Sequence, residues 1–155
     1  MRLVLFIAAL CMAQPSLADP FKKIRRAIET KQTDTLTKLL KHPKSIVRQR
    51  AAAGLQACPK AEVSERSAAP LLACLENSNE RDYVRAACGQ TLSVIGEKRA
   101  VAGLIGAIGS AKGDARFLLV QALAVYRTPE AKATLEELKG DVDPFVSSAA
   151  TGNAQ

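Results

Sequence analysis

Apolar residues recur along this chain at nearly constant spacing, and this repetition limits its fold more than any other feature of its 155 residues. Val47 and Leu55 have counterparts 37 residues later in Val84 and Leu92, and a further step of 31 residues leads from Leu92 to Leu123. Periods of about 20 to 50 residues indicate a repeat protein, in which each unit buries its apolar face only against its neighbours. We therefore expect an array of similar units that is stabilised by the contacts between them.

The segments within each unit have the periodicity of amphipathic helices. Val101, Leu104, Ile105 and Ile108, for example, follow the spacing i, i+3, i+4, i+7 that places apolar side chains on one helix face. Proline, glycine and asparagine residues separate these segments, and no alternating β pattern competes with them. The pattern predicts nine short helices, over residues 20–30, 33–41, 45–57, 63–76, 82–95, 97–108, 114–126, 129–139 and 144–153.

Four of the predicted helices begin at residues that are suited to capping, namely Ser45, Asp82, Asp114 and Asp143. A side-chain oxygen at the N-cap accepts hydrogen bonds from backbone N–H groups that have no partner within the helix. Pro144 stands at the first helical position of the last helix, where its missing N–H costs nothing. We expect these four side chains to cap their helices.

The repeated blocks resemble a known family. Asp82-Tyr83-Val84-Arg85-Ala86-Ala87, Ala69-Pro70-Leu71-Leu72 and Val94-Ile95-Gly96 are similar to HEAT repeats of the short bacterial type, and the resemblance covers most of residues 30–155. It implies an all-α fold, a right-handed α-solenoid of antiparallel helix pairs. It also implies a protein that binds or scaffolds a protein partner, as is typical of such solenoids.

The first eighteen residues have the features of an export signal. Arg2 is followed by an apolar run over residues 3–12, and Ser16-Leu17-Ala18 has the small residues that signal peptidase requires. The run is shorter than the ~20 residues that span a bilayer as a helix. We predict a signal peptide over residues 1–18, cleaved after Ala18, and a mature HEAT-like domain over residues 19–155. The mature protein is then periplasmic or secreted.

The positive charge of the chain is concentrated near the start of this mature domain. The formal net charge is +7. Residues 19–60 contain eleven Lys and Arg against three Asp and Glu, whereas residues 61–155 contain ten against twelve. The first predicted helix has an apolar stripe and basic residues over the rest of its surface. The candidate binding residues are Lys22, Lys23, Arg25, Arg26, Lys38, Lys41 and Lys44.

A basic face of this kind has two interpretations. It binds an anionic partner, which is an acidic protein, an anionic membrane or a wall polymer, or it is the solvated cap that the first repeat of a solenoid needs. An acidic protein is the favoured partner, and no nucleic acid is expected outside the cytoplasm. The sequence leaves the oligomeric state open.

Nothing in the sequence indicates catalysis. Bilin lyases and a group of alkylpurine DNA glycosylases are also built from HEAT-like helices, so the resemblance leaves a lyase-type enzyme as an alternative. Both act on intracellular substrates, and neither has a motif that can be placed in this chain. His42 is the one histidine, and the glycine-rich segment 103–113 lacks the Gly-Lys-Ser/Thr ending of a phosphate loop. We predict no catalytic residue, no metal site and no cofactor.

Two further sets of residues have both a functional and a structural interpretation. Arg48, Arg85 and Arg116 recur at one repeat position. They form either a ladder for an acidic ligand or, as favoured here, hydrogen bonds to carboxylates or carbonyls of the adjacent repeat.

The mature domain has three cysteines, and an oxidising compartment permits one disulfide among them. Cys74 and Cys88 lie on consecutive antiparallel helices near their connecting turn, so a bridge, if present, joins these two. The alternative is that Cys58, Cys74 and Cys88 are all small buried apolar side chains.

Overall fold

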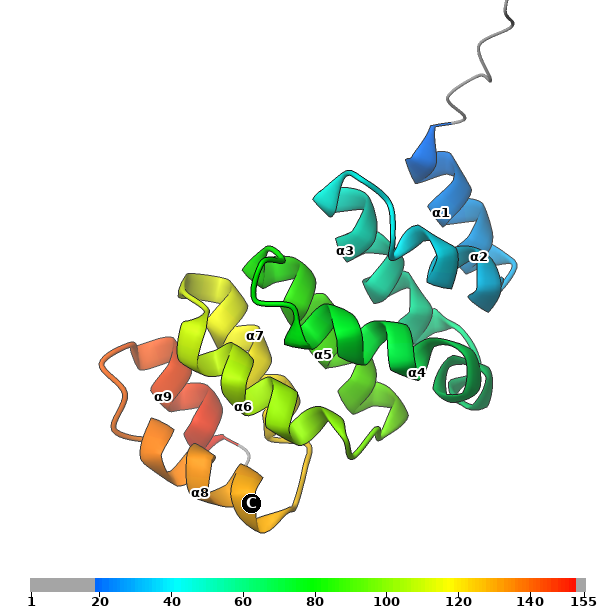
Figure 1. The fold of residues 1–155 in the computed structure, drawn as a ribbon. Helices are drawn as coiled ribbons and strands as arrows, with labels where there is room; N and C mark the ends of the chain where they lie inside the picture. Colours follow the sequence, from blue (N-terminus) through cyan, green and yellow to red (C-terminus); the bar gives the residue numbers. More distant parts are fainter. Residues whose placement is uncertain (1–18, 153–155) are drawn as a thin grey trace, which may run out of the picture.

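The computed structural model describes residues 19–152, so the signal peptide predicted over residues 1–18 lies outside the described part of the chain. Residues 19–152 form nine α-helices and one short 3₁₀ helix, with no strand among them (Figure 1). The helices are α1 (Pro20–Glu29), α2 (Thr33–Leu39), α3 (Ser45–Gly54), the 3₁₀ helix η1 (Leu55–Ala57), α4 (Lys60–Glu76), α5 (Asp82–Ile95), α6 (Ala100–Ser110), α7 (Gly113–Leu123), α8 (Pro129–Leu138) and α9 (Pro144–Thr151).

All nine predicted helices are present, and the largest differences, of three residues, are at the starts of α4 and α6 and at the ends of α3 and α7. Helix α4 begins at Lys60, directly after Pro59, three residues before the predicted start. Helix α6 begins at Ala100, three residues after the predicted start. Gly96 ends α5 in the left-handed conformation, with φ 75°, and Glu97 lies in the following turn, where its carboxylate accepts a hydrogen bond from the backbone N–H of Arg99.

Only one of the four predicted caps is found. The Asp143 carboxylate accepts a hydrogen bond from the backbone N–H of Phe145 at 2.9 Å. The prediction is wrong for Ser45, Asp82 and Asp114, because each lies inside its helix, which begins one residue or more earlier than a cap at that position requires. In the first turn the two aspartates still face the positive end of the helix dipole, which is a favourable place for an acidic side chain.

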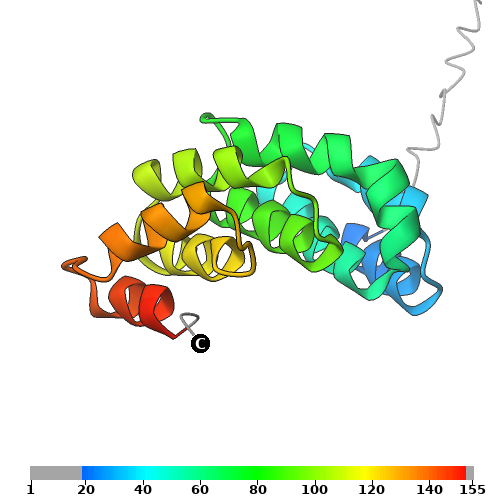
Figure 2. The same ribbon diagram turned by 90° about the horizontal axis from the view of Figure 1, so that it is seen from below.

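The helices form two layers. Helices α1, α3, α5, α7 and α9 pack one against the next in the first layer, and α2, α4, α6 and α8 do so in the second. Figure 2 shows the two layers side by side along the array. Consecutive helices cross from one layer to the other, and α5 contacts α3, α4, α6 and α7. The prediction of an all-α array of antiparallel helix pairs is therefore confirmed.

The core is continuous between the layers and is built from the repeated positions. Leu55, Leu92 and Leu123, which are equivalent in the repeat, are each 0% exposed. Gly89 in α5 allows the layers to approach closely, because a Cβ there would lie 2.7 Å from the Cδ2 atom of Leu104. Among residues 19–152 no helix is long and apolar enough to cross a bilayer.

Candidate functional site: the basic N-terminal face

Helix α1 separates its apolar and basic residues cleanly. Asp19 caps the helix by accepting a hydrogen bond from the backbone N–H of Phe21 at 3.0 Å. Ile24 and Ala27 are buried, and α1 packs on α2 and α3. The four predicted binding residues of this helix cover an arc of about 160° on its other side, since successive helical residues are about 100° apart. These four exposed residues are Lys22, Lys23, Arg25 and Arg26.

The other three predicted binding residues lie on or after α2. Lys38 is in the last turn of this helix, and Lys41 and Lys44 are in the connection that leads to α3. All three are exposed. The structure therefore places the predicted residues at the surface of the N-terminal end of the array (Figure 1). We call the seven residues Lys22, Lys23, Arg25, Arg26, Lys38, Lys41 and Lys44 the basic face.

No residue of the basic face forms an ion pair with an Asp or Glu of the described chain. Of the eleven Lys and Arg in residues 19–60, only Arg48 forms an ion pair with an Asp or Glu of the described chain. One of the three acidic residues of the same segment, Asp34, is paired with Arg66 of α4 at 3.0 Å. The positive charge of this end is therefore left facing solvent, where it attracts anions over a distance set by the salt concentration.

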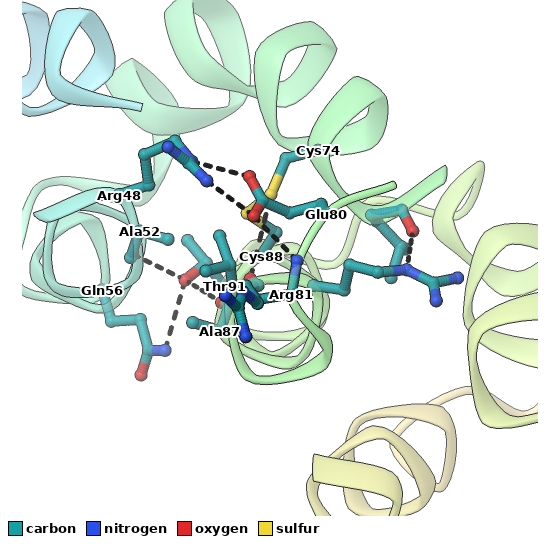
Figure 3. Close-up of a disulfide and its surroundings, with 12 residues drawn as sticks. Arg48, Ala52, Gln56, Cys74, Glu80, Arg81, Ala87, Cys88 and Thr91 are labelled. Carbon is teal, nitrogen blue, oxygen red and sulfur yellow. Dashed lines mark hydrogen bonds and ion pairs between the residues drawn. A yellow bond between two sulfur atoms is a disulfide. The ribbon is translucent and has the colours of Figure 1, made fainter. Parts of the chain in front are cut away.

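Arg48 itself has a structural role. Its Nε and Nη2 atoms donate to the two carboxylate oxygens of Glu80 at 2.6 and 2.7 Å, and Nη1 donates to the backbone carbonyl of His42 at 2.6 Å (Figure 3). Burial raises the pKa of Glu80, but the hydrogen bonds from Arg48 and from the backbone N–H of Arg81 outweigh it and hold this pKa below its ordinary value. The pair joins α3 to the loop that enters α5.

The equivalent arginines of the next two repeats make the same kind of connection. Arg85 donates to the carbonyl of Leu75 at 3.0 Å and to the Ser110 hydroxyl at 2.9 Å. Arg116 donates to both carboxylate oxygens of Asp141, at 2.9 and 2.5 Å, and lowers the pKa of that carboxyl. The predicted bonding between repeats is confirmed, and these three guanidinium groups hold the units in register.

His42, which lies between α2 and α3, organises the connection that contains two of the basic residues. Its Nδ1 atom accepts a hydrogen bond from the backbone N–H of Lys44 at 3.1 Å. In the described range, no group of three or more His, Cys, Asp and Glu lies close enough together to hold a metal ion.

The two cysteines selected from the sequence lie side by side in the structure. Cys74 of α4 and Cys88 of α5 form a disulfide across the turn between these helices, with Cα atoms 6.4 Å apart (Figure 3). Cys58, after η1, is free and buried. The bridge connects the two layers beside the Arg48–Glu80 pair.

A groove that the sequence did not predict lies between α1 and α3. It holds about 490 Å³ and is lined by apolar side chains of both helices, with two arginines beside them. Its location depends on how α1 packs on α3, which no local pattern predicts. The lining residues are Phe21, Ile24, Arg25 and Ile28 of α1, and Arg50, Ala53, Gly54 and Ala57 of α3 and η1.

The fold and the bonds between its units define this chain as a helical-repeat protein. The sequence model of the HEAT-repeat family matches residues 68–154, which is more than half of the chain, and the protein belongs to this family. HEAT repeats generally mediate protein–protein interaction and scaffolding. A search of the curated proteins found no match.

Proposed function

We propose that this chain is an exported interaction module that binds an acidic protein partner through the basic face. The family supports a protein partner, since HEAT repeats typically bind proteins. The observation that carries the anionic chemistry is the contrast in ion pairing between residues 19–60 and the rest of the array. Arg66, Arg85, Arg99 and Arg116 of the later repeats form ion pairs with carboxylates, whereas the seven residues of the basic face form none within the described chain.

The placement of two lysines supports a role in binding rather than in folding. Lys22 and Lys23 lie in the first turn of α1, which contains no acidic residue. Cations at this end oppose the helix dipole and cost stability, whereas acidic residues would add to it. Unpaired lysines at a position that disfavours them are better explained by attraction of an anionic partner than by the stability of the helix.

Export is the second part of the proposal. It rests on the charged residue, apolar run and small residues of positions 1–18, and a disulfide between Cys74 and Cys88 is compatible with an oxidising compartment. The mature chain then begins at Asp19, directly at the cap of α1. Mass spectrometry of the protein from its native source is expected to find this N-terminus, and a chain that retains Met1 would contradict export.

The test of binding uses the mature chain as bait in an extract of the cell envelope, followed by purification of the captured protein and measurement of its affinity. A variant with Lys22, Lys23, Arg25 and Arg26 replaced by Gln removes charge but keeps helix propensity. We expect this variant to lose at least about tenfold in affinity. Affinity of the unchanged chain falls steeply between about 0.1 and 1 M salt, as the screening length decreases from ~10 to ~3 Å.

The matched control is the triple variant Arg66→Gln, Arg99→Gln and Lys132→Gln, which changes exposed cations in the later part of the array. It is expected to bind nearly as well as the unchanged chain, since Arg66 and Arg99 are already paired with carboxylates. Equal binding by the quadruple variant would contradict the proposal. Binding to anionic vesicles or wall polymer, with no purified protein retained, would replace the protein partner by a surface.

A further inference from the structure

We infer that the groove between α1 and α3 receives a large apolar side chain of the partner, carried on an acidic segment whose carboxylates pair with Arg25 and Arg50. The inference rests on the proposed function, because it names how the acidic partner is recognised. It differs from that function in requiring an apolar contact as well as charge. Each part of it follows from the groove's lining and from its position at the end of the array.

Most of the apolar side chains that line the groove are only partly buried by the protein itself. Phe21 and Ile28 of α1 are half-buried, and Ala53 and Ala57 on the other side are exposed. Ile24 is buried in the wall between them. A volume of about 490 Å³ lies within the range of ligand-binding pockets. A bulky side chain of a partner would remove this apolar surface from water.

Further along the same layer, the contact between α3 and α5 is made by side chains of the protein itself. A step of 37 residues takes Gly54 of α3 to Thr91 of α5. The hydroxyl of Thr91 donates to the carbonyl of Ala52 at 2.8 Å, and the amide of Gln56 donates to Thr91 at 3.2 Å, so side chains connect α3 and α5 directly (Figure 3). Thr91 is buried by this contact.

At the N-terminal end, Gly54 occupies the position that is equivalent to Thr91. A Cβ at Gly54 would lie 2.9 Å from the Cδ1 and Cγ1 atoms of Ile28, so the glycine admits Ile28 against α3. No side-chain hydrogen bond joins α1 to α3 within residues 19–152. The two helices are held by apolar contact and by Arg50 lying over the Phe21 ring, and the groove runs along this contact.

The chemistry of the rim selects an acidic segment. The guanidinium group of Arg50 lies over the ring of Phe21, 5.0 Å from its centroid. A guanidinium that lies over an aromatic ring keeps N–H groups able to bind a carboxylate in two-pronged fashion. Arg25 is exposed on the same groove and also has no carboxylate partner within the described chain. An apolar pocket with charge at its edge is typical of the central contacts of protein interfaces.

The experiment compares two short fluorescein-labelled peptides rich in glutamate, one with a central Leu and the other with Ser in its place. Binding to the mature chain is measured by fluorescence anisotropy. The Leu peptide is expected to bind about tenfold more tightly, since burial of one large apolar side chain is worth at least that factor. At about 1 M salt, where charge is screened, this preference for Leu remains.

Two variants distinguish the contribution of the groove to peptide binding from the contribution of charge. Ala53→Phe fills the groove without changing charge, and its matched control Ala133→Phe changes an exposed alanine of α8. Ala53→Phe is expected to abolish the preference for Leu and to leave the Ser peptide unaffected, whereas Ala133→Phe changes neither. Arg25→Gln with Arg50→Gln weakens the binding of both peptides. Circular dichroism melts verify that the variants are folded.

The outcomes distinguish the two proposals. Equal binding of the two peptides, or an Ala53→Phe variant that still prefers Leu, would overturn the groove while leaving charge-based binding intact. Failure of both peptides to bind the unchanged chain at low salt would overturn the proposed function itself. Preference for Leu that is lost only in Ala53→Phe supports the groove.

Discussion

The N-terminal end and the later repeats of this solenoid follow one helical pattern but differ in whether their cations are bonded to neighbouring units. From α5 to α9 the recurring arginines are bound to neighbouring elements, Arg85 to Leu75 and Ser110 and Arg116 to Asp141. Over α1 to α3, Arg48 is the one cation bound in this way, and the basic face has none of these bonds. Cations between units therefore serve the fold, whereas those of the basic face have no carboxylate partner within the described chain.

The two regions also differ in how many neighbours hold each helix. Helix α5 packs on α3, α4, α6 and α7, whereas α1 packs on α2 and α3 only. Because each unit of a solenoid is stabilised by its neighbours, we expect the middle of the array to carry most of the free energy of unfolding. The end then tolerates changes that the middle does not.

The largest expected effect is at the centre of the array. Leu92→Asp places a carboxylate at a position that is 0% exposed, where an unpartnered charge is prohibitively costly, and the variant should not fold. Lys132→Ala, at an exposed site of α8, should change the free energy of unfolding by less than ~0.5 kcal/mol. Circular dichroism melts measure both. Similar melting temperatures would contradict the core register.

The next effect is that of the disulfide. Its cysteines are 14 residues apart, and closing a loop of about that length stabilises a fold by about 3 kcal/mol. Cys74→Ala with Cys88→Ala should lower the free energy of unfolding by about this amount. Urea unfolding with and without reductant measures it: reductant should affect the unchanged chain and the Cys58→Ala control, but not the double variant. Insensitivity of the unchanged chain would show that no bridge forms.

An ion pair between units should contribute less to the free energy of unfolding than the disulfide does. Arg116→Ala leaves the Asp141 carboxylate, whose side chain is 11% exposed, without its main partner. Loss of these charge-assisted hydrogen bonds should lower the free energy of unfolding, by less than loss of the disulfide does. Arg26→Ala in α1, where no such bond exists, should cost less than ~0.5 kcal/mol. Equal losses in urea unfolding would remove the distinction between the two regions.

The paired carboxylates of the later repeats should also make stability depend on pH. A hydrogen bond from Arg99 lowers the pKa of Glu97 from 4.5 to about 2. A pKa that is lower in the folded state stabilises the protein above the unfolded value, and this contribution is lost as pH falls from about 4.5 to about 2. Glu97→Gln should flatten this part of the profile. The effect is below ~1 kcal/mol, because Arg99 is exposed to solvent.

The smallest expected changes in the free energy of unfolding have opposite signs at two places in the basic face. Lys22→Gln with Lys23→Gln relieves cations at the start of α1 and should raise the free energy of unfolding by about 0.3 kcal/mol per residue at low salt. Lys38→Gln removes a cation from the last turn of α2, where it is favourable, and should lower it slightly. Careful urea titrations in low and high salt measure these differences. A clear loss of stability in the Lys22 and Lys23 variant would assign these lysines to the fold.

The helices and the repeated core were predictable from the amino-acid sequence alone. Apolar spacing and the breaks between segments are local signals, and α5 has the predicted bounds, Asp82–Ile95. The role of Arg48, Arg85 and Arg116 was also predictable, because a residue at one position of every unit meets the same surroundings in each. Helix starts were less predictable, since Ser45 and Asp82 lie one residue after the true cap and Asp114 lies two residues after it.

Tertiary structure alone decided the partners of these residues and the shape of the end of the array. Glu80 lies 32 residues from Arg48, and no local pattern selects it among the other carboxylates. The groove exists because Gly54 admits Ile28 and places Phe21 beneath Arg50. Such contacts depend on how one helix lies against another, whereas helical periodicity depends only on neighbours a few residues apart along the chain.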